Sequence, residues 1–216
     1  SVILTGAGVA DPFRELATVV TTVGPTYHGV QSAGATAEWL AEGATAADGN
    51  PTFAQLSIPV AKASAFLSAS YEIFQDSDIG TQIPQLIADA KATLENGAFS
   101  TGSGSGAPKG IVTAVSVTGS TVTATTRGAF TAASEGDLFA LVEALPPRAR
   151  QGRSPAIVGN IVTLNTLRKM ETAGGASTWT TLGDGTPNTV LGMKLRESYG
   201  MTSATTSGST VLVAGD

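Results

Sequence analysis

The sequence predicts an α+β protein that combines a long projecting β-hairpin, a long helix and a region of mixed helices and strands. Three observations support this expectation. Residues 27–50 are polar, rich in glycine and alanine and free of lysine and arginine, and strand-like runs flank them. Residues 78–97 carry apolar side chains at helical spacing. The remaining sequence alternates between glycine-rich, β-branched and helix-forming segments.

The composition favours a protein whose surface is covered by other protein. Of 216 residues, 42% are apolar and only 13% are charged, about half of the ~25% common in globular chains. Cysteine is absent, which excludes disulfides, thiol catalysis and cysteine-based zinc sites. The net charge of −5 disfavours tight binding of nucleic-acid phosphates, so any DNA nearby is expected to be enclosed without sequence-specific contacts. No apolar run is long enough to cross a bilayer, and no membrane partner is expected.

The hairpin is expected to extend over residues 26–58. Strand-like runs at 19–23 and 55–71 flank the polar stretch, and Asp48-Gly-Asn-Pro51 is predicted to form the connecting turn. At ~3.3 Å per residue, arms of about a dozen residues reach roughly 40 Å, which is too long to lie within a small domain. The hairpin should therefore project, and it should have no core of its own.

The long helix is predicted over residues 78–97, with Asp78 as its N-cap and Gly97 at its C-terminal end. One face carries apolar residues three and four positions apart, which predicts a buried stripe. The stripe consists of Ile83, Leu86, Ile87, Ala90 and Leu94.

Shorter elements are expected in the rest of the chain. A glycine-rich turn follows the long helix at residues 101–106. We then predict, in order, a hairpin at 115–125, a helix at 135–145, a strand at 156–158, a helix at 161–171 and a final strand near 210–216.

The sequence contains weak candidates for enzymatic chemistry. Gly6 and Gly8 follow a strand-like run, as in a dinucleotide-binding turn, but Asp11 and Pro12 replace the small residue and the helix start that hold a pyrophosphate. His28 is the only histidine, and no Gly-x-Ser-x-Gly or Walker motif occurs. We therefore expect no catalytic residue, no metal site and no cofactor.

One basic cluster stands out, formed by Arg148, Arg150 and Arg153 after a Pro-Pro pair. Two interpretations remain open. The cluster is either a solvated loop or a contact for an acidic surface of a partner.

Several segments resemble those of tailed-bacteriophage major capsid proteins with the Hong Kong 97-like fold. Residues 37–43 resemble the Trp-x-x-Glu stretch of that family's extended loop, and residues 70–76 resemble the end of its returning strand. Residues 94–110 are similar to the glycine- and proline-containing turn after the family's spine helix. Residues 189–194 resemble its Leu-Gly-x-Pro segment, although Lys194 stands where proline is usual, and residues 211–216 resemble a late strand.

The resemblance implies a shell subunit with a partial N-terminal arm at residues 1–25, an extended loop at 26–58, a peripheral domain at 59–115 and an axial domain at 116–216. Its spine helix would be residues 78–97. The N-terminal arm is short, the start lacks Met, and the last peripheral strands are missing, so the chain is expected to be processed or part of a longer product.

The same resemblance implies self-assembly into hexamers and pentamers that form a virion shell around DNA, after assembly in the host cytoplasm. Scaffolding, portal and decoration proteins would be its other partners. Together with the residue patterns above, it leads us to expect three sets of residues for contact and packing: loop residues Glu38, Trp39, Glu42 and Asp48, basic-loop residues Arg148, Arg150 and Arg153, and spine-core residues Ile83, Leu86, Ile87 and Leu94. Two alternatives stay open, an encapsulin-type nanocompartment shell and, more distantly, a nucleotide-dependent enzyme that uses the Gly6/Gly8 turn.

Overall fold

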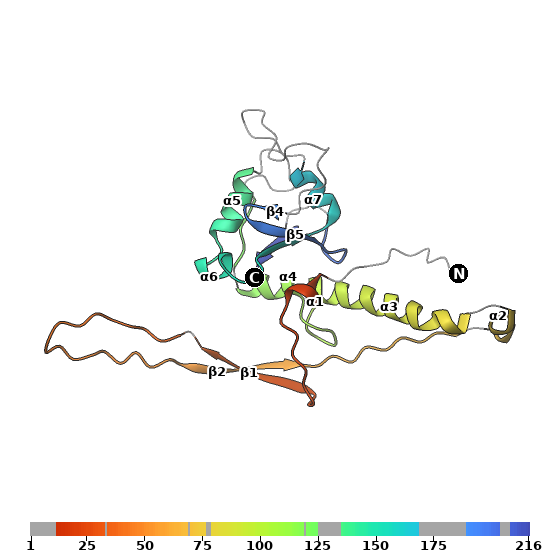
Figure 1. Ribbon diagram of the computed structural model, residues 1–216, viewed down its shortest axis with the longest axis horizontal. Coiled ribbons are helices and arrows are strands. Elements are labelled where there is room, and N and C mark those ends of the chain that lie inside the picture. The colour runs from red at the N-terminus through yellow and green to blue at the C-terminus, as the bar shows by residue number, and fades with distance from the viewer. Residues whose placement is uncertain are drawn as a thin grey trace. The chain divides into compact units, whose positions relative to one another are not determined.

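A computed structural model describes residues 12–32, 34–68, 70–76, 79–118, 120–124, 135–168, 189–203 and 208–216. The chain divides into two compact units, Val20–Lys62 and the combination of Ser1–Val19 with Ala63–Asp216. We call the first the hairpin unit and the second the helix–sheet unit (Figure 1). The Gly6/Gly8 turn and Asp78 lie outside the described residues.

The hairpin unit is a two-stranded ribbon. Strand β1 (Thr26–Ser32) pairs antiparallel with β2 (Phe53–Pro59), and Ser32 faces Phe53 at the distal end of the pairing. The same register continues beyond the strands, because a Cβ at Gly49 would lie 2.8 Å from the carbonyl oxygen of Thr36. The two arms therefore run side by side to a distant tip, as Figure 1 shows.

The tip of the hairpin lies at residues 41–44. The Ala44 N–H donates to the Ala41 carbonyl oxygen at 3.0 Å, and Gly43 has a φ of +84°. Glycine adopts this conformation without steric cost, as the third residue of a type II turn requires. The turn predicted at Asp48–Pro51 is therefore wrong, because those residues lie within the returning arm. Asp48 makes only a local bend there, where its Oδ1 accepts the Asn50 N–H at 3.1 Å.

The strand predicted over residues 55–71 is shorter than expected. β2 ends at Pro59, and residues 60–68 form no strand. The physical reason is the lack of a partner, because β1 begins at Thr26, directly opposite Pro59. Helix α2 (Tyr71–Asp76) follows and leads to the long helix.

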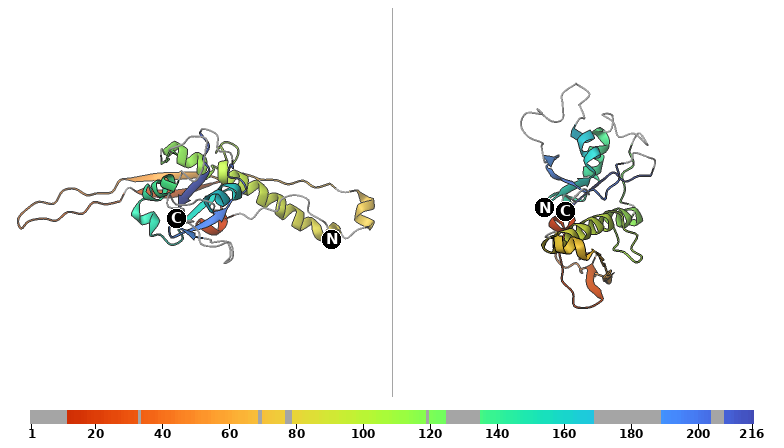
Figure 2. Two further views of the ribbon diagram at one scale, coloured as in Figure 1. Left: turned by 90° about the horizontal axis from the view of Figure 1, so that it is seen from above. Right: turned by 90° about the vertical axis from the view of Figure 1, so that its right-hand side faces the viewer.

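The long helix α3 (Ile79–Thr101) has 23 residues and passes through the predicted end at Gly97. It is the long helix coloured yellow to green in Figure 2. Pro84 lies near its start, where the missing N–H removes one backbone hydrogen bond. The helix ends at Thr101, and the N–H of the next residue, Gly102, still donates to the Ala98 carbonyl oxygen at 2.9 Å. A Cβ at Gly102 would lie 2.2 Å from the Pro108 carbonyl oxygen, so the glycine-rich turn can close only over a residue without a side chain.

Substitution by alanine is expected to have opposite effects at Gly97 and at Gly102. Gly97→Ala should stabilise the chain by about 0.5–1 kcal/mol, because an added Cβ meets nothing within 4 Å and alanine loses less backbone entropy on folding. Gly102→Ala should be destabilising because of the overlap with Pro108. Urea unfolding of both variants measures the two changes. Destabilisation by Gly97→Ala would contradict a helix that continues through residue 97.

Helix α4 (Ile111–Thr118) replaces the first arm of the hairpin predicted at residues 115–125. That prediction is wrong for the described part, where residues 120–124 also form no strand. The β-branched residues favoured a strand, but Ile111 and Val112 pack against buried residues of the sheet, and this tertiary contact overrides the local preference.

The second half of the helix–sheet unit is built around a four-stranded sheet with the order β4-β5-β3-β6. Its strands are β4 (Thr189–Val190), β5 (Met193–Glu197), β3 (Ala156–Gly159) and β6 (Leu212–Gly215). β3 runs parallel to β5 and antiparallel to β6. Helices α5 (Glu135–Glu143), α6 (Pro147–Arg150) and α7 (Ile161–Arg168) complete this half.

Side chains on both faces of the sheet are covered. On one face, Ile157 and Leu195 lie in a cluster with Leu138 of α5 and Leu164 of α7. On the other, Val158, Met201 and Val213 are packed against α4 and the short α1 (Phe13–Leu16). Figure 1 shows α5 and α7 beside the sheet, and α1 and α4 where α3 meets it. The predicted helix at 135–145 and the strand at 156–158 are confirmed to within two residues.

Candidate assembly surfaces

The hairpin unit carries an exposed apolar face that the sequence analysis did not identify. Tyr27 faces Ile58 and Gly29 faces Leu56, so these side chains share one side of the ribbon. The Tyr27 ring lies over Gly29, where an added Cβ would be 3.2 Å from the ring. Leu56 and Ile58 remain 43% and 49% exposed. Alternation of apolar residues at 54, 56, 58 and 60 was the available signal.

The opposite face of the ribbon carries more polar residues, and it also exposes Val30 and Phe53. His28 and Gln55 lie diagonally across the two strands, with 3.2 Å between Nδ1 and Nε2. This contact gives the single histidine a structural partner. The two faces of the ribbon thus differ, and the apolar one is suited to packing against protein.

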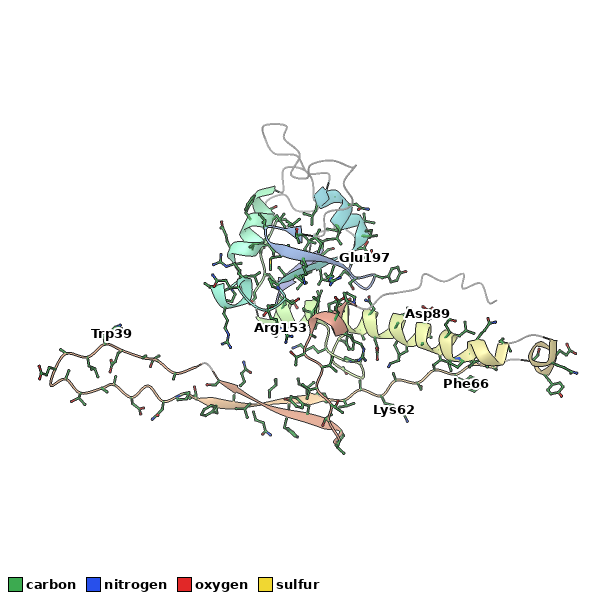
Figure 3. The ribbon with its side chains drawn as sticks, in the orientation of Figure 1. Trp39, Lys62, Phe66, Asp89, Arg153 and Glu197 are labelled. Atoms are coloured by element: carbon green, nitrogen blue, oxygen red, sulfur yellow. The ribbon has the colours of Figure 1, made fainter. Side chains whose placement is uncertain are left out.

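The distal loop carries the predicted contact residues on its surface. Glu38, Trp39, Glu42 and Asp48 are all exposed, and Trp39 is fully so (Figure 3). Glu38 also has a structural role, because its Oε1 accepts the Ala47 N–H across the loop. Every described residue of the hairpin unit is exposed or half-buried. An exposed tryptophan on an arm without a core is a typical anchor for a protein interface.

The apolar stripe of α3 is not a core of this chain. Ile83 and Leu86 are half-buried, whereas Ile87 and Leu94 are 40% and 54% exposed. The prediction of a buried spine core is therefore wrong within the single chain. The periodicity identified the apolar face correctly, but the buried clusters form at the sheet, and α3 enters the interior only at its last turns.

The predicted basic loop is formed by α6 and the residues that follow it, and Arg148, Arg150 and Arg153 are all exposed. Figure 3 marks Arg153. The structure also places a carboxylate at this loop, since Asp216 Oδ1 accepts the Ser154 N–H at 2.6 Å. The loop is therefore not purely basic, as the sequence suggested, although its three guanidinium groups outnumber that single carboxylate.

Within the described residues, no group of three or more histidine or acidic side chains is arranged to hold a metal ion. Among the same residues, no helix has both the length and the apolar character needed to cross a bilayer.

Comparison with known proteins identifies the family. The family model for phage capsid proteins matches residues 1–216, the whole chain. The chain belongs to the phage capsid family. It is a major capsid protein, a structural component of the virion that self-assembles into the head shell. The match favours this function over an encapsulin-type shell and over a nucleotide-dependent enzyme.

Solved capsid structures share the fold of this capsid protein. The capsid of a native GTA particle has 24% identity and a TM-score of 0.78, and the likeness covers 100% of this chain and 75% of that one. A solved structure from Microbacterium phage Oxtober96 has 16% identity and a TM-score of 0.73, and the likeness covers 100% of this chain and 73% of that one. A structure from Gordonia phage Cozz has 14% identity and a TM-score of 0.65, and the likeness covers 99% of this chain and 70% of that one. Among curated proteins, none matches the chain.

The shared architecture is the Hong Kong 97-like fold, and the expected α+β class with this fold is confirmed. The interface residues carried over from the resemblance remain predictions. Their exposure on the single chain is compatible with contacts between subunits and does not identify the partner surface.

Proposed function

We propose that the capsid protein assembles into hexamers and pentamers through the hairpin unit, which lies across a neighbouring subunit. The observation that supports this most strongly is the lack of any buried residue among the described residues of Val20–Lys62. A two-stranded ribbon is marginally stable alone, so it gains most by covering its apolar face against other protein. A second copy of the chain supplies that protein in a shell.

The apolar stripe of α3 is a second surface that a neighbouring subunit would cover in the shell. Ile87 and Leu94 are large apolar side chains of this stripe, and both are exposed on the single chain. Covering one such side chain completely is worth about 1.5–3 kcal/mol, and exposed apolar faces mark interaction sites. A neighbour's hairpin unit fits this role because its own exposed face is apolar.

In this proposal residues 1–25 are a partial N-terminal arm, 26–58 the extended loop, 59–115 the peripheral domain and 116–216 the axial domain. The shell encloses DNA without reading its sequence and performs no enzymatic reaction. Scaffolding, portal and decoration proteins bind during assembly in the host cytoplasm. The overall charge of −5 supports enclosure rather than tight DNA binding.

The test is the assembly state of the purified chain. Sedimentation velocity and negative-stain electron microscopy should show closed particles, or rings of five and six subunits, at high protein concentration. A compact monomer at every concentration would contradict the proposal. Particles that carry a protein cargo bound to their inner wall would instead favour the encapsulin alternative.

Charge complementarity predicts how two of these surfaces meet. Apart from Lys62 at its end, the hairpin unit carries only acidic charges, whereas Arg148, Arg150 and Arg153 share one exposed loop. We expect Arg150→Glu to weaken assembly, and to do so more at low than at high salt, because salt screens attraction between exposed charges. Light scattering at two salt concentrations measures this effect.

The matched control is Lys194→Glu, which makes the same change of charge at another exposed position. It should leave assembly nearly unchanged. An equal effect of Arg150→Glu at both salt concentrations would remove the electrostatic explanation.

A further inference from the structure

The last turns of α3 carry buried polar side chains that the shell-forming surfaces do not explain. Asn96 and Ser100 are both fully buried, four residues apart on one side of the helix. Ser198, which follows β5, is fully buried as well. Buried polar groups in proteins are nearly always hydrogen-bonded, so the partners of these side chains need to be identified.

These three side chains form one connected network. Asn96 Oδ1 accepts the Gly200 N–H at 2.7 Å and the Ser198 hydroxyl at 3.1 Å. The hydroxyl oxygens of Ser198 and Ser100 are 2.9 Å apart. Since the Ser198 proton points to Asn96, Ser100 donates to Ser198. The end of α3 is thus joined to residues 198–200 by hydrogen bonds rather than by an apolar contact.

Close approach of the backbone is part of this joint. A Cβ at Gly200 would lie 2.5 Å from Ser100 Oγ and 2.6 Å from the Asn96 carbonyl oxygen. The turn is also fixed to the sheet, because the Ser198 N–H donates to the Gly159 carbonyl oxygen at 2.9 Å. Asn160 Nδ2 donates to the Met201 carbonyl oxygen at 3.1 Å. The turn therefore links α3 rigidly to β3.

A buried polar joint constrains orientation more strictly than an apolar one. Apolar side chains can slide or rotate past each other while they stay buried, whereas each buried donor loses its partner when the two sides shift. A single buried polar residue can fix the register of packed helices for this reason. The hydrogen bonds around Asn96 can therefore all form only when α3 has one orientation relative to the sheet.

We propose that Asn96 is a positioning residue that fixes the direction of α3 relative to the sheet and so sets the curvature of the shell. The consequence for curvature rests on the proposed assembly. From Asn96 to the start of α3 the helix extends about 25 Å, so a tilt of roughly 5° moves that end by about 2 Å. Repeated at every subunit, such a shift changes the angle between neighbours.

The orientation itself can be tested without a shell. The chain has no cysteine, so spin labels can be attached to Ala88→Cys on α3 and Val162→Cys on α7, both at exposed positions. Electron spin resonance should give one narrow distance distribution for this pair. Asn96→Ala should broaden it by several ångströms, and Ser100→Ala, the milder variant, should broaden it less. The control is Leu138→Ala, which destabilises the other face of the sheet.

A narrow, unshifted distribution in a folded Asn96→Ala variant overturns the inference, as does equal broadening in Leu138→Ala. If Asn96→Ala does not fold, Ser100→Ala decides by the same criterion. Electron microscopy then tests the curvature. Asn96→Ala should widen the spread of particle diameters, or give open sheets, where Leu138→Ala gives closed particles of normal size. Failure of the unaltered chain to assemble would overturn the proposed function and leave the spin-label result to decide the orientation.

Discussion

A chain in which Asn-Gly replaces residues 33–52 is expected to stay folded and to form no shell. The replacement joins Ser32 to Phe53, which face each other in the antiparallel register, through the dipeptide preferred in two-residue hairpin turns. The described residues removed are exposed, apart from the half-buried Gly49 and Pro51. The free energy of unfolding should therefore change by no more than about 0.5 kcal/mol.

Assembly should fail because the replacement removes Trp39 and the acidic side chains and shortens the arm. Electron microscopy and sedimentation measure particle yield, and thermal unfolding measures the fold. Ala46→Ser, an exposed change within the intact loop, is the control and should assemble normally. If the shortened chain unfolds, or if it still builds shells, the distal loop does not act between subunits.

The hairpin shows which features the sequence could predict. A polar arm with no lysine or arginine, flanked by strand-like runs, was sufficient to predict a hairpin of two antiparallel arms without a core of its own. The position of its tip was not, because Asp-Gly-Asn-Pro is a stronger local turn signal than Glu42-Gly43. The pairing of β1 with β2 fixes where the chain must reverse, and pairing between distant residues is not visible in a short window.

The long helix illustrates a different limit. Helical periodicity located α3 and its apolar face, yet it could not distinguish an intramolecular core from a surface that another subunit covers. The same pattern predicts both. The exposure of Leu94 and Ile87 in the single chain shows that the stripe is not an intramolecular core. Whether another subunit covers it is a question for assembly experiments.

The joint at Asn96 had no signal in the sequence. Its partners, Ser198 and Gly200, lie about a hundred residues further along the chain, with separations of 102 and 104 positions. Asparagine, serine and glycine are also common in ordinary loops, so their types carry no information without the fold. The charged candidate contact residues, in contrast, could be proposed from composition, because charge of one sign is a local property of a segment, and they remain predictions.

The second large effect is expected at the centre of the sheet, where Ile157→Asp should unfold the helix–sheet unit. Ile157 is completely buried on β3, with Leu195 and Ala214 facing it on the two neighbouring strands. The substitution loses about 1.5–3 kcal/mol of apolar burial, and an unpaired buried carboxylate adds several kcal/mol more. The sum reaches the 5–15 kcal/mol that stabilises a typical domain.

Leu94→Asp is the matched control, because it places the same carboxylate on the exposed stripe of α3. Circular dichroism and urea unfolding should show a folded chain whose stability is close to that of the unaltered protein, next to an Ile157→Asp variant without a cooperative transition. Assembly provides the second measurement. A neighbour that covers the stripe must bury the new charge, so Leu94→Asp should assemble poorly although its subunits are intact. Normal shells from Leu94→Asp would show that this face of α3 stays in solvent, and a folded Ile157→Asp would contradict the sheet as the core of the unit.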